Sequence, residues 1–267
     1  MCFGGEDASP PEYGKVKIVI KPQYASALSQ YTKNLISTDL KKYAVVSVTP
    51  EIVDPSIIYV ELNSNVYYNK SLTTLNQSEI KAAVISALDG YRATSDLEKF
   101  NGRFKYSRIV GIIDATDPAI TSNETDIKLR KDFIPVLNTI TEYEICYQNV
   151  VKSGCSNPSV QSSGFVVADY PSDVVYLADD QQGSIYLYKI DPTTQDRFVL
   201  NAQQGTIDYA KGEVMLNRLN IIKGSYSDER IELRVLPTNK DIYAYREAYL
   251  SMDLQSSVFL ITQEALI

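Results

Sequence analysis

The hydrophobic pattern in the first part of the chain switches between two periods. Residues 15–20 alternate β-branched and polar side chains and end at Lys21-Pro22, which predicts a strand. The next apolar residues recur mostly at three- and four-residue steps, which predicts an amphipathic helix over residues 24–42 with one buried stripe: Leu28, Tyr31, Leu35, Leu40 and Tyr43. Val45, Val46 and Val48 begin a second predicted strand, and residues 57–68 form a third after the turn-forming residues 53–56.

A second helical pattern follows and then returns to an extended one. A helix is expected to open near Ser78, whose hydroxyl can cap free amides, and to extend towards Phe100. Its apolar side chains recur at helical spacing: Ile80, Ala83, Val84, Ala87, Leu88 and Tyr91. A short helix around residues 109–113 and a strand over residues 120–133 complete the order β-α-β-β-α-(α)-β. This order predicts an α+β fold with a split βαβ, ferredoxin-like domain over residues 15–137, after an N-terminal arm of residues 1–14.

From about Thr139 the helical period disappears and short apolar runs alternate with turn signals. The predicted strands cover residues 143–147, 164–168, 174–177, 184–190, 198–200, 206–209, 213–216 and 231–236. Turns at Gln182-Gly183, Asp191-Pro192, Lys211-Gly212 and Lys223-Gly224 are typical of an antiparallel sandwich or barrel. We therefore expect an antiparallel β domain over residues 138–238. Residues 239–267 are expected to form a closing helix and strand that serve as a dimerisation element.

The composition indicates a folded protein with an acidic surface. The chain has 267 residues, of which 44% are hydrophobic and 22% charged, close to globular averages. The formal net charge is −7, which argues against nucleic acid and against an anionic membrane as partners. No run of about 18 apolar residues is present, so no membrane-spanning helix is predicted.

The absence of histidine removes most familiar catalytic arrangements. Without imidazole there is no Ser-His-Asp or Cys-His nucleophile pair and no histidine-ligated zinc. Paired-carboxylate chemistry stays open, and the densest cluster is Asp114, Asp117, Glu124 and Asp126, with Asn123 among them. Its spacing does not match a calcium loop and favours a solvated turn, and Asp179-Asp180 favours a hairpin turn. No catalytic residue, cofactor or metal site is therefore predicted, and the chain is expected not to be an enzyme.

Cysteine and tyrosine usage favours packing and assembly over chemistry. Cys2, Cys146 and Cys155 form no C-x-x-C pair, and Cys146 alternates within an apolar run as a buried packing residue would. The chain has twenty tyrosines and no tryptophan. Tyrosine is common in half-buried strands, at protein interfaces and on sugar-binding surfaces, and these three interpretations remain open at this point.

Several short motifs, in order, resemble one known family. They include residues 3–7 and 10–16, Ile20-Lys21-Pro22, Ile52-Val53-Asp54-Pro55, Tyr106-Ser107 with Ile113-Asp114, residues 205–209 with Gly212, and Pro237 with Asp241-Ile242. The pattern resembles the C-terminal half of the baseplate wedge protein of T4-like contractile-tailed bacteriophages, related to the baseplate J family. Family members are much longer, and their preceding region builds the wedge core, so those core contacts are not assumed here.

The resemblance implies a structural virion protein rather than an enzyme. It implies a tail baseplate component, assembled in the host cytoplasm, that pairs with a second copy and binds other baseplate wedge proteins, linking adjacent wedges in the ring around the tail hub. We expect a two-fold dimer through C-terminal apolar and tyrosine residues, namely Tyr243, Tyr245, Tyr249, Leu250 and Phe259. The alternative is a carbohydrate-binding or carbohydrate-cleaving phage tail protein that uses paired carboxylates.

Overall fold

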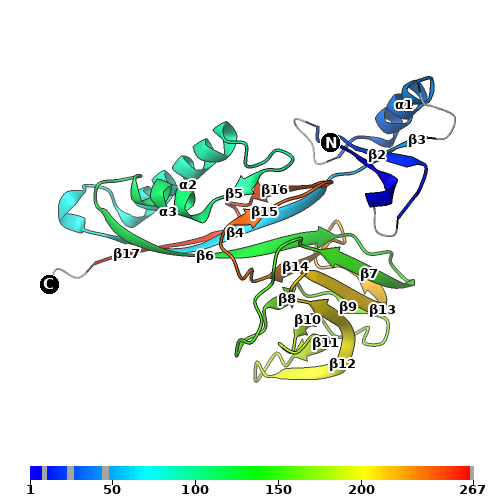
Figure 1. The fold of residues 1–267 in the computed structure, drawn as a ribbon. Coiled ribbons are helices and arrows are strands. Elements are labelled where there is room, and N and C mark those ends of the chain that lie inside the picture. The colour runs from blue at the N-terminus through cyan, green and yellow to red at the C-terminus, as the bar shows by residue number, and fades with distance from the viewer. Residues whose placement is uncertain (8–10, 23–26, 44–47, 265–267) are drawn as a thin grey trace.

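The computed structural model describes residues 1–7, 11–22, 27–43 and 48–264. Within these ranges the chain is a mixed α and β protein, with three α-helices and with most strands gathered into a large sheet. Figure 1 shows two helices above a central group of long strands, a β-rich region below it, and a small N-terminal sheet with its own helix at one end. The coarse prediction of an α+β protein is confirmed.

The N-terminal sheet has three strands and one helix. Strand β1 (Cys2–Gly4) pairs antiparallel with β2 (Lys15–Val19), which pairs parallel with β3 (Thr49–Val53). Helix α1 (Gln30–Lys41) begins at Ser29, whose hydroxyl accepts the amide of Thr32, and it packs against β3. Residues 44–47, which include the predicted strand start at Val45 and Val46, lie outside the described residues.

The predicted buried stripe of α1 is largely exposed. Tyr31, Leu35 and Tyr43 are 78%, 54% and 86% exposed, and α1 has no buried residue. The helix was expected from its 3.6-residue period, and it does form. The sheet that it covers has only three short strands, so it takes one side of the helix and leaves the other outward.

The central strands follow the sequence prediction closely. Strand β4 (Ser56–Tyr68) pairs antiparallel with β6 (Ile120–Phe133), from Tyr59 opposite Arg130 to Tyr68 opposite Ile120. Helices α2 (Gln77–Thr94) and α3 (Tyr106–Asp114) lie on one face of these strands (Figure 1). The short strand β5 (Arg103–Phe104) links the two helices.

Helix α2 is fixed by its first turn and by one apolar stripe. Its cap is Asn76 rather than the expected Ser78, and Asn76 and Glu79 form a reciprocal capping box. Ile80, Val84 and Leu88 are fully buried, as the period predicts. The helix ends at Thr94, six residues before the predicted end at Phe100.

The ferredoxin-like arrangement is not confirmed. Strands β2 and β3 belong to the separate N-terminal sheet, whereas β4 and β6 belong to the large sheet, so the two β-α-β segments do not share one sheet. The position beside β4 is taken instead by strands from the C-terminal end of the chain. The division into domains at residues 14, 137 and 238 stays a prediction.

The β-rich region continues from β6 as one hydrogen-bonded path. The path runs through β14, β8, β10, β11, β12 and β13 to β7, all antiparallel to their neighbours, with β9 beside β13. Two predicted strands, 198–200 and 206–209, form the single long strand β12. The bounds are β7 (Ile140–Cys146), β8 (Val160–Ser162), β9 (Val166–Val167), β10 (Val175–Asp179), β11 (Ser184–Ile190), β12 (Arg197–Asp208), β13 (Glu213–Lys223) and β14 (Ile231–Val235).

The C-terminal segment forms three strands, so the prediction of a closing helix plus strand is wrong. Strand β15 (Ile242–Tyr243) pairs with β5. Strands β16 (Ala248–Met252) and β17 (Val258–Gln263) both run parallel to β4, on its side opposite β6. The apolar residues of this segment are buried against β4 and the helices, which stabilises strands over a short local helix.

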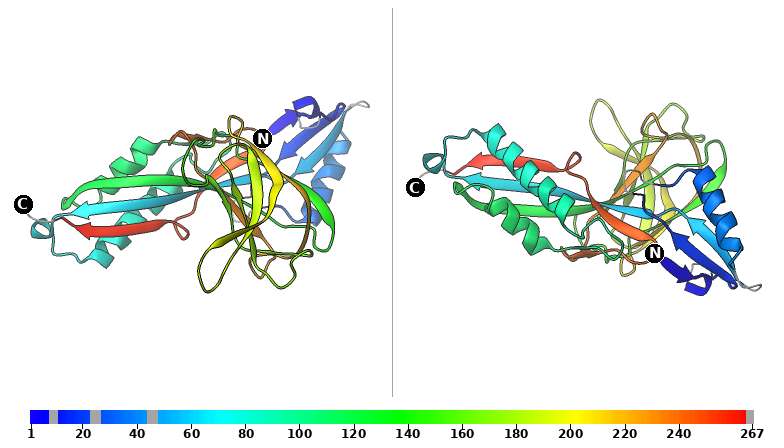
Figure 2. Two further views of the ribbon diagram at one scale, coloured as in Figure 1. Left: turned by 90° about the horizontal axis from the view of Figure 1, so that it is seen from below. Right: turned by 90° about the horizontal axis from the view of Figure 1, so that it is seen from above.

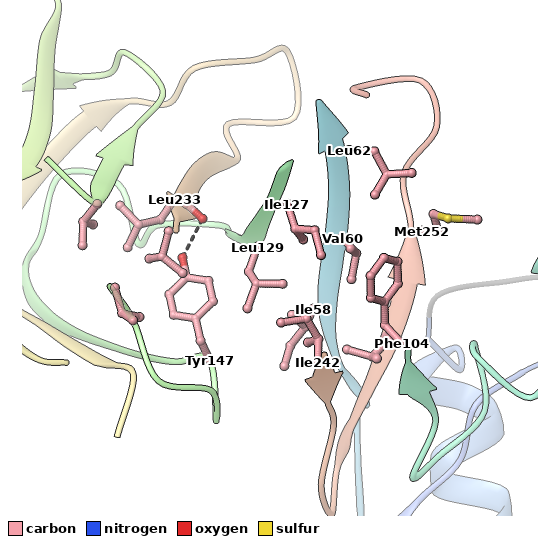
Figure 3. Close-up of a cluster of buried hydrophobic side chains, with 14 of the residues drawn as sticks. Ile58, Val60, Leu62, Phe104, Ile127, Leu129, Tyr147, Leu233, Ile242 and Met252 are labelled. Carbon is pink, nitrogen blue, oxygen red and sulfur yellow. Dashed lines mark hydrogen bonds between the residues drawn. The ribbon is translucent and has the colours of Figure 1, made fainter. Parts of the chain in front are cut away.

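One hydrophobic core joins the helical layer to the β-rich region. Figure 3 shows Ile58 and Val60 of β4 between Phe104 and Met252 on one side and Leu129 on the other. Tyr147 is fully buried, and its hydroxyl donates a 2.6 Å hydrogen bond to the carbonyl of Leu233. That hydroxyl would otherwise be an unpaired polar group in the core, so this bond allows the ring to be buried there.

The molecule is elongated, with the two ends built from opposite ends of the chain. Figure 2 shows β17 and the C-terminus at one end and the N-terminal sheet at the other. Seen from below, strands β17, β4 and β6 lie side by side with the helices behind them (Figure 2). The β17–β4–β6 sheet therefore has one face covered by helices and one face free of them.

Candidate interface at the C-terminal edge strand

Strand β17 ends the sheet and leaves an open edge. It pairs only with β4, from Val258 opposite Asn63 to Gln263 opposite Tyr68. Its side chains alternate, because Phe259 and Ile261 are 4% and 7% exposed, whereas Val258 and Leu260 are 58% and 57% exposed. The six residues contain no charge and no proline, which are the usual features that keep an edge strand from pairing.

The neighbouring strand β16 presents the contrasting case, because side chains cover its outer edge. Phe100 forms an antiparallel bridge with Tyr249. The Glu98 carboxylate accepts the amide of Met252 at 3.1 Å, and Arg92 donates to the Met252 carbonyl at 3.3 Å. Within the described ranges no comparable group binds the outer edge of β17. The two halves of one sheet edge thus differ in their availability to a partner.

A buried ionic cluster holds the link between β16 and β17. The Arg130 guanidinium donates to Glu61 at 2.7 Å, to Asp253 at 2.8 Å, to Ser256 at 3.0 Å and to Asp132 at 2.8 Å. Glu61 and Arg130 are 5% and 4% exposed. The cluster therefore ties the link at residues 253–257 to the middle of β4 and β6, which sets where β17 resumes pairing.

Strand β14 extends the cluster into the β-rich region. Arg234 donates to Glu61 at 2.9 Å and to Glu232 at 2.7 Å. Burial raises the pKa of Asp132 above its ordinary value. Burial acts in the same direction on Asp253, but hydrogen bonds from Ser256 and Arg130 outweigh it and lower the pKa of Asp253. The alternating charges hold the two strands and the link together as one unit.

The five residues predicted for the interface do not share one surface. Tyr249, Leu250 and Phe259 are 4%, 0% and 4% exposed, and they pack inside the chain. Tyr249 is flanked by Phe100, with ring centroids 6.1 Å apart, and by the Lys21 ammonium, 3.9 Å above its ring. In this conformation these three side chains complete the chain's own core.

Tyr243 and Tyr245 lie elsewhere, beside β5. Their rings stack at 6.3 Å, Tyr243 is half-buried, and Tyr245 is 54% exposed. Their amides accept no strand partner in the large sheet and instead donate to Asn149 and Gln148. An interface role for these two residues stays a prediction.

The carboxylate cluster of the sequence analysis forms local turns and pairs. Asp114 accepts the Asn123 amide at 2.7 Å, and Asp117 accepts the backbone amide of Ala119 at 2.8 Å. Asp126 pairs with Lys240 at 2.9 Å. These contacts give the carboxylates structural partners of the kind that turns need.

The second acidic pair shapes the hairpin between β10 and β11. Asp180 accepts the amides of Gln182 and Ser184, as the turn prediction requires. Asp179 is 1% exposed and accepts the Val160 amide at 2.7 Å and the Tyr209 hydroxyl at 2.6 Å. Burial, together with this hydrogen bond, raises the pKa of Tyr209. Asp179 is therefore a buried acceptor that fixes three segments.

A pocket of about 840 Å³ lies between the N-terminal sheet and strands β7 and β13, and its lining includes Lys131, Glu144, Cys146 and Glu247. Burial lowers the pKa of Lys131, whose ammonium donates to Ser56 at 2.7 Å. Burial raises the pKa of Cys146, which disfavours the reactive thiolate. This environment agrees with the packing interpretation of Cys146.

Two surveys of the described residues bear on metal and membrane binding. In the ranges the structure describes, no group of three or more cysteine, aspartate or glutamate side chains could hold a metal ion. Among the same residues, no helix has the length and apolar character needed to cross a membrane.

Sequence reasoning missed Val258 and Leu260. The signal is weak, because residues 258–261 are a continuous apolar run in which outward and inward positions look alike. The alternation becomes evident only when β4 and helix α2 bury Phe259 and Ile261.

Comparison with known proteins gives two family matches that coincide with structural units. Residues 1–53 match the family of C-terminal domain I of the baseplate structural protein gp6, and residues 56–132 match C-terminal domain III of that protein. The first range is the N-terminal sheet with α1, and the second contains β4, α2, α3 and almost all of β6. The boundary falls at Asp54-Pro55, between β3 and β4.

A single relative extends the comparison to half of the chain. The chain is 28% identical over 148 residues to the baseplate wedge protein gp6 of Enterobacteria phage T4. The match covers 55% of this chain and 22% of the relative, so it spans about a fifth of the relative's length. These matches confirm the resemblance that the sequence motifs indicated.

Proposed function

Because the chain is related to the C-terminal region of T4-like baseplate wedge proteins, we propose that it is a structural component of a phage tail baseplate wedge. It self-associates as a two-fold dimer and so links adjacent wedges in the ring around the tail hub. Its other partners are further baseplate wedge proteins, and it acts in the virion after assembly in the host cytoplasm. The matched family is described as structural, which agrees with a non-enzymatic role.

The observation that carries the self-association is the open, uncharged edge of β17. A strand edge presents a row of amides and carbonyls that only another strand satisfies well. Two β17 strands placed antiparallel across a two-fold axis would pair by their backbones, which is the known mode of β-strand addition. The β17–β4–β6 sheets of two copies would then form one continuous sheet.

The exposed side chains support the same arrangement. Val258 and Leu260 protrude on the face free of helices. In a two-fold pair, each of these side chains would lie close to its counterparts across the new strand contact, so one patch is used twice. The position of β17 at the end of the elongated molecule leaves room for a second copy (Figure 2).

The test is the mass of the purified chain in solution, measured by light scattering over a concentration series. We expect a dimer for the parent chain and a monomer for Leu260→Lys, because a lysine in the middle of an edge strand opposes strand addition. The melting temperature of Leu260→Lys should stay close to that of the parent monomer, since the side chain is 57% exposed. A parent chain that stays monomeric at high concentration would refute self-association.

Val258 and Val199 provide a matched pair of variants. Both are strand valines that are 58% exposed, the first on β17 and the second on β12. Val258→Lys should weaken the dimer, whereas Val199→Lys should leave the mass unchanged. Phe259→Ala and Tyr249→Ala, which remove buried rings, should lower the melting temperature. If Val258→Lys and Val199→Lys behave alike, the interface is not at β17.

A further inference from the structure

A second pocket is lined by cations and neutral polar groups. It has a volume of about 350 Å³ and lies where β6, β8, β14 and the start of β12 meet. Its charged lining residues are Lys128, Arg197 and Arg234, and its polar lining includes Asn157, Ser159 and Gln161. No aspartate or glutamate is among the residues that line it. This is unusual in a chain with 33 acidic and 26 basic residues.

Lys128 has no carboxylate partner because the nearest candidates are already bound. Glu61 lies directly opposite Lys128 in the β4–β6 register. Both Glu61 oxygens are occupied, since Arg130 donates to Oε1 at 2.7 Å and Arg234 to Oε2 at 2.9 Å. Asp126, two residues earlier on β6, pairs with Lys240. In the part of the chain that the structure describes, Lys128 forms no ion pair, and its side chain is exposed.

Arg197 is likewise free to bind an anion. Its guanidinium lies 5.1 Å from the centroid of the Tyr188 ring. A ring attracts the face of a guanidinium and fixes its plane, but it does not use the N–H groups at the edge. Among the described residues Arg197 forms no ion pair. Two unpaired cations therefore line one small pocket.

Arg234 contributes a third, rigidly held cation. Its Nε donates to Glu61 and its Nη2 donates to Glu61 and Glu232, at distances between 2.7 and 3.2 Å. Its Nη1 makes no hydrogen bond within the described ranges. The two carboxylates thus hold the guanidinium in one orientation, and Nη1 remains available as a donor to a ligand in the pocket.

We propose that this pocket binds an oxyanion, a phosphate or a carboxylate. Three cations that line one pocket repel one another, and an anion bound among them removes that repulsion. Lysine and arginine form their strongest hydrogen bonds with charged oxygen acceptors. The amides of Asn157 and Gln161 and the hydroxyl of Ser159 add neutral donors suited to the same oxygens.

The same chemistry has two sources, free phosphate and the acidic side chains of a protein segment. Isothermal titration of the full chain with inorganic phosphate and, separately, with a tetraglutamate peptide distinguishes them. We expect saturable binding of at least one probe, with affinity that falls as sodium chloride is raised. Binding of phosphate alone indicates a small-anion site, and binding of the peptide alone indicates an acidic protein segment.

The decisive variant is the double substitution Lys128→Gln with Arg197→Gln. Both side chains are exposed and unpaired, so the melting temperature should not change. The affinity for the bound probe should fall at least tenfold, or about 1.4 kcal/mol. Lys81→Gln, an exposed lysine on α2, is the charge-matched control and should bind as the parent does. Lys128→Arg, which keeps the charge, should retain binding.

Two results would overturn the proposal. One is the absence of saturable binding of either probe to the parent chain. The other is a double variant that binds as tightly as Lys81→Gln. The site is separate from the β17 edge, so these variants should leave the solution mass unchanged, and failure here does not affect the proposal on self-association.

Discussion

Replacing Arg130 by methionine tests whether the buried ionic cluster holds the central sheet together. The side chain of Arg130 is 5% exposed and binds carboxylates on β4, on β6 and in the link before β17. Methionine preserves most of the volume and the unbranched stem but removes every donor. The variant leaves Asp132 and Asp253 without their main cationic partner, whereas Glu61 keeps Arg234.

The magnitude follows from how deeply each partner is buried. Removing one partner of a buried ion pair typically costs 3–5 kcal/mol, because the remaining charge is left uncompensated. The side chains of Asp132 and Asp253 are 20% and 17% exposed, so water can solvate them in part, and Glu61 stays paired. We therefore expect a loss near the lower end, about 3 kcal/mol. That is a large fraction of the 5–15 kcal/mol typical of a folded domain.

Urea unfolding measures this loss, and hydrogen exchange locates it. The midpoint should fall without a change in the slope against urea concentration, since the surface exposed on unfolding is unchanged. Amides of β17 should exchange faster than those of β4, because the link at residues 253–257 loses its anchor. Lys42→Met is the control, since its ion pair with Asp39 is 65% and 62% exposed and should contribute less than about 1 kcal/mol. A loss for Arg130→Met no larger than that of the control would refute the role of the cluster.

Three further outcomes follow from single contacts. Asn76→Ala removes the capping box of α2 and should lower the free energy of unfolding by about 1 kcal/mol, measured by urea unfolding, with Thr73→Ala outside the helix as a comparison. Burial raises the pKa of Tyr249 to about 12, so the neutral phenol stabilises the fold below pH 10 and that stability is lost as pH rises towards 12; Tyr249→Phe should flatten this alkaline loss. Hydrogen bonds lower the pKa of Asp253, so its contribution is present above the unfolded value near pH 4 and is lost below it; Asp253→Asn should therefore lose less stability than the parent on acidification.

The local elements could be predicted from the sequence because their signals are local. Residues 120–133 alternate over fourteen positions, and β6 has those bounds. The stripe of Ile80, Val84 and Leu88 gives α2, and the hairpin signals around Asp180 and Lys211 give turns. Each of these patterns is satisfied by residues within one turn or one strand, so a single window of sequence contains the information.

The sheet assignment could not be predicted in the same way. Strands β16 and β17 lie beside β4, which is nearly 200 residues earlier in the chain. Apolar patterning shows that a segment needs a buried face, but it does not identify the strand that provides it. The tail residues Tyr249, Leu250 and Phe259 therefore appeared available for an interface, whereas β4 and the helices bury them. The exposed residues at the β17 edge, Val258 and Leu260, were missed for the same reason.

The contrast between β16 and β17 gives the open edge its significance. Both strands pair with β4, and both border the same side of the sheet. Along β16, Arg92, Glu98 and Phe100 occupy the backbone groups that a partner would need. An edge that is protected over five residues and left uncharged and apolar over the next six differs by its side chains, not by its backbone geometry. The protected half shows how this chain blocks strand addition, so the unprotected half is the place where strand addition meets no such obstacle.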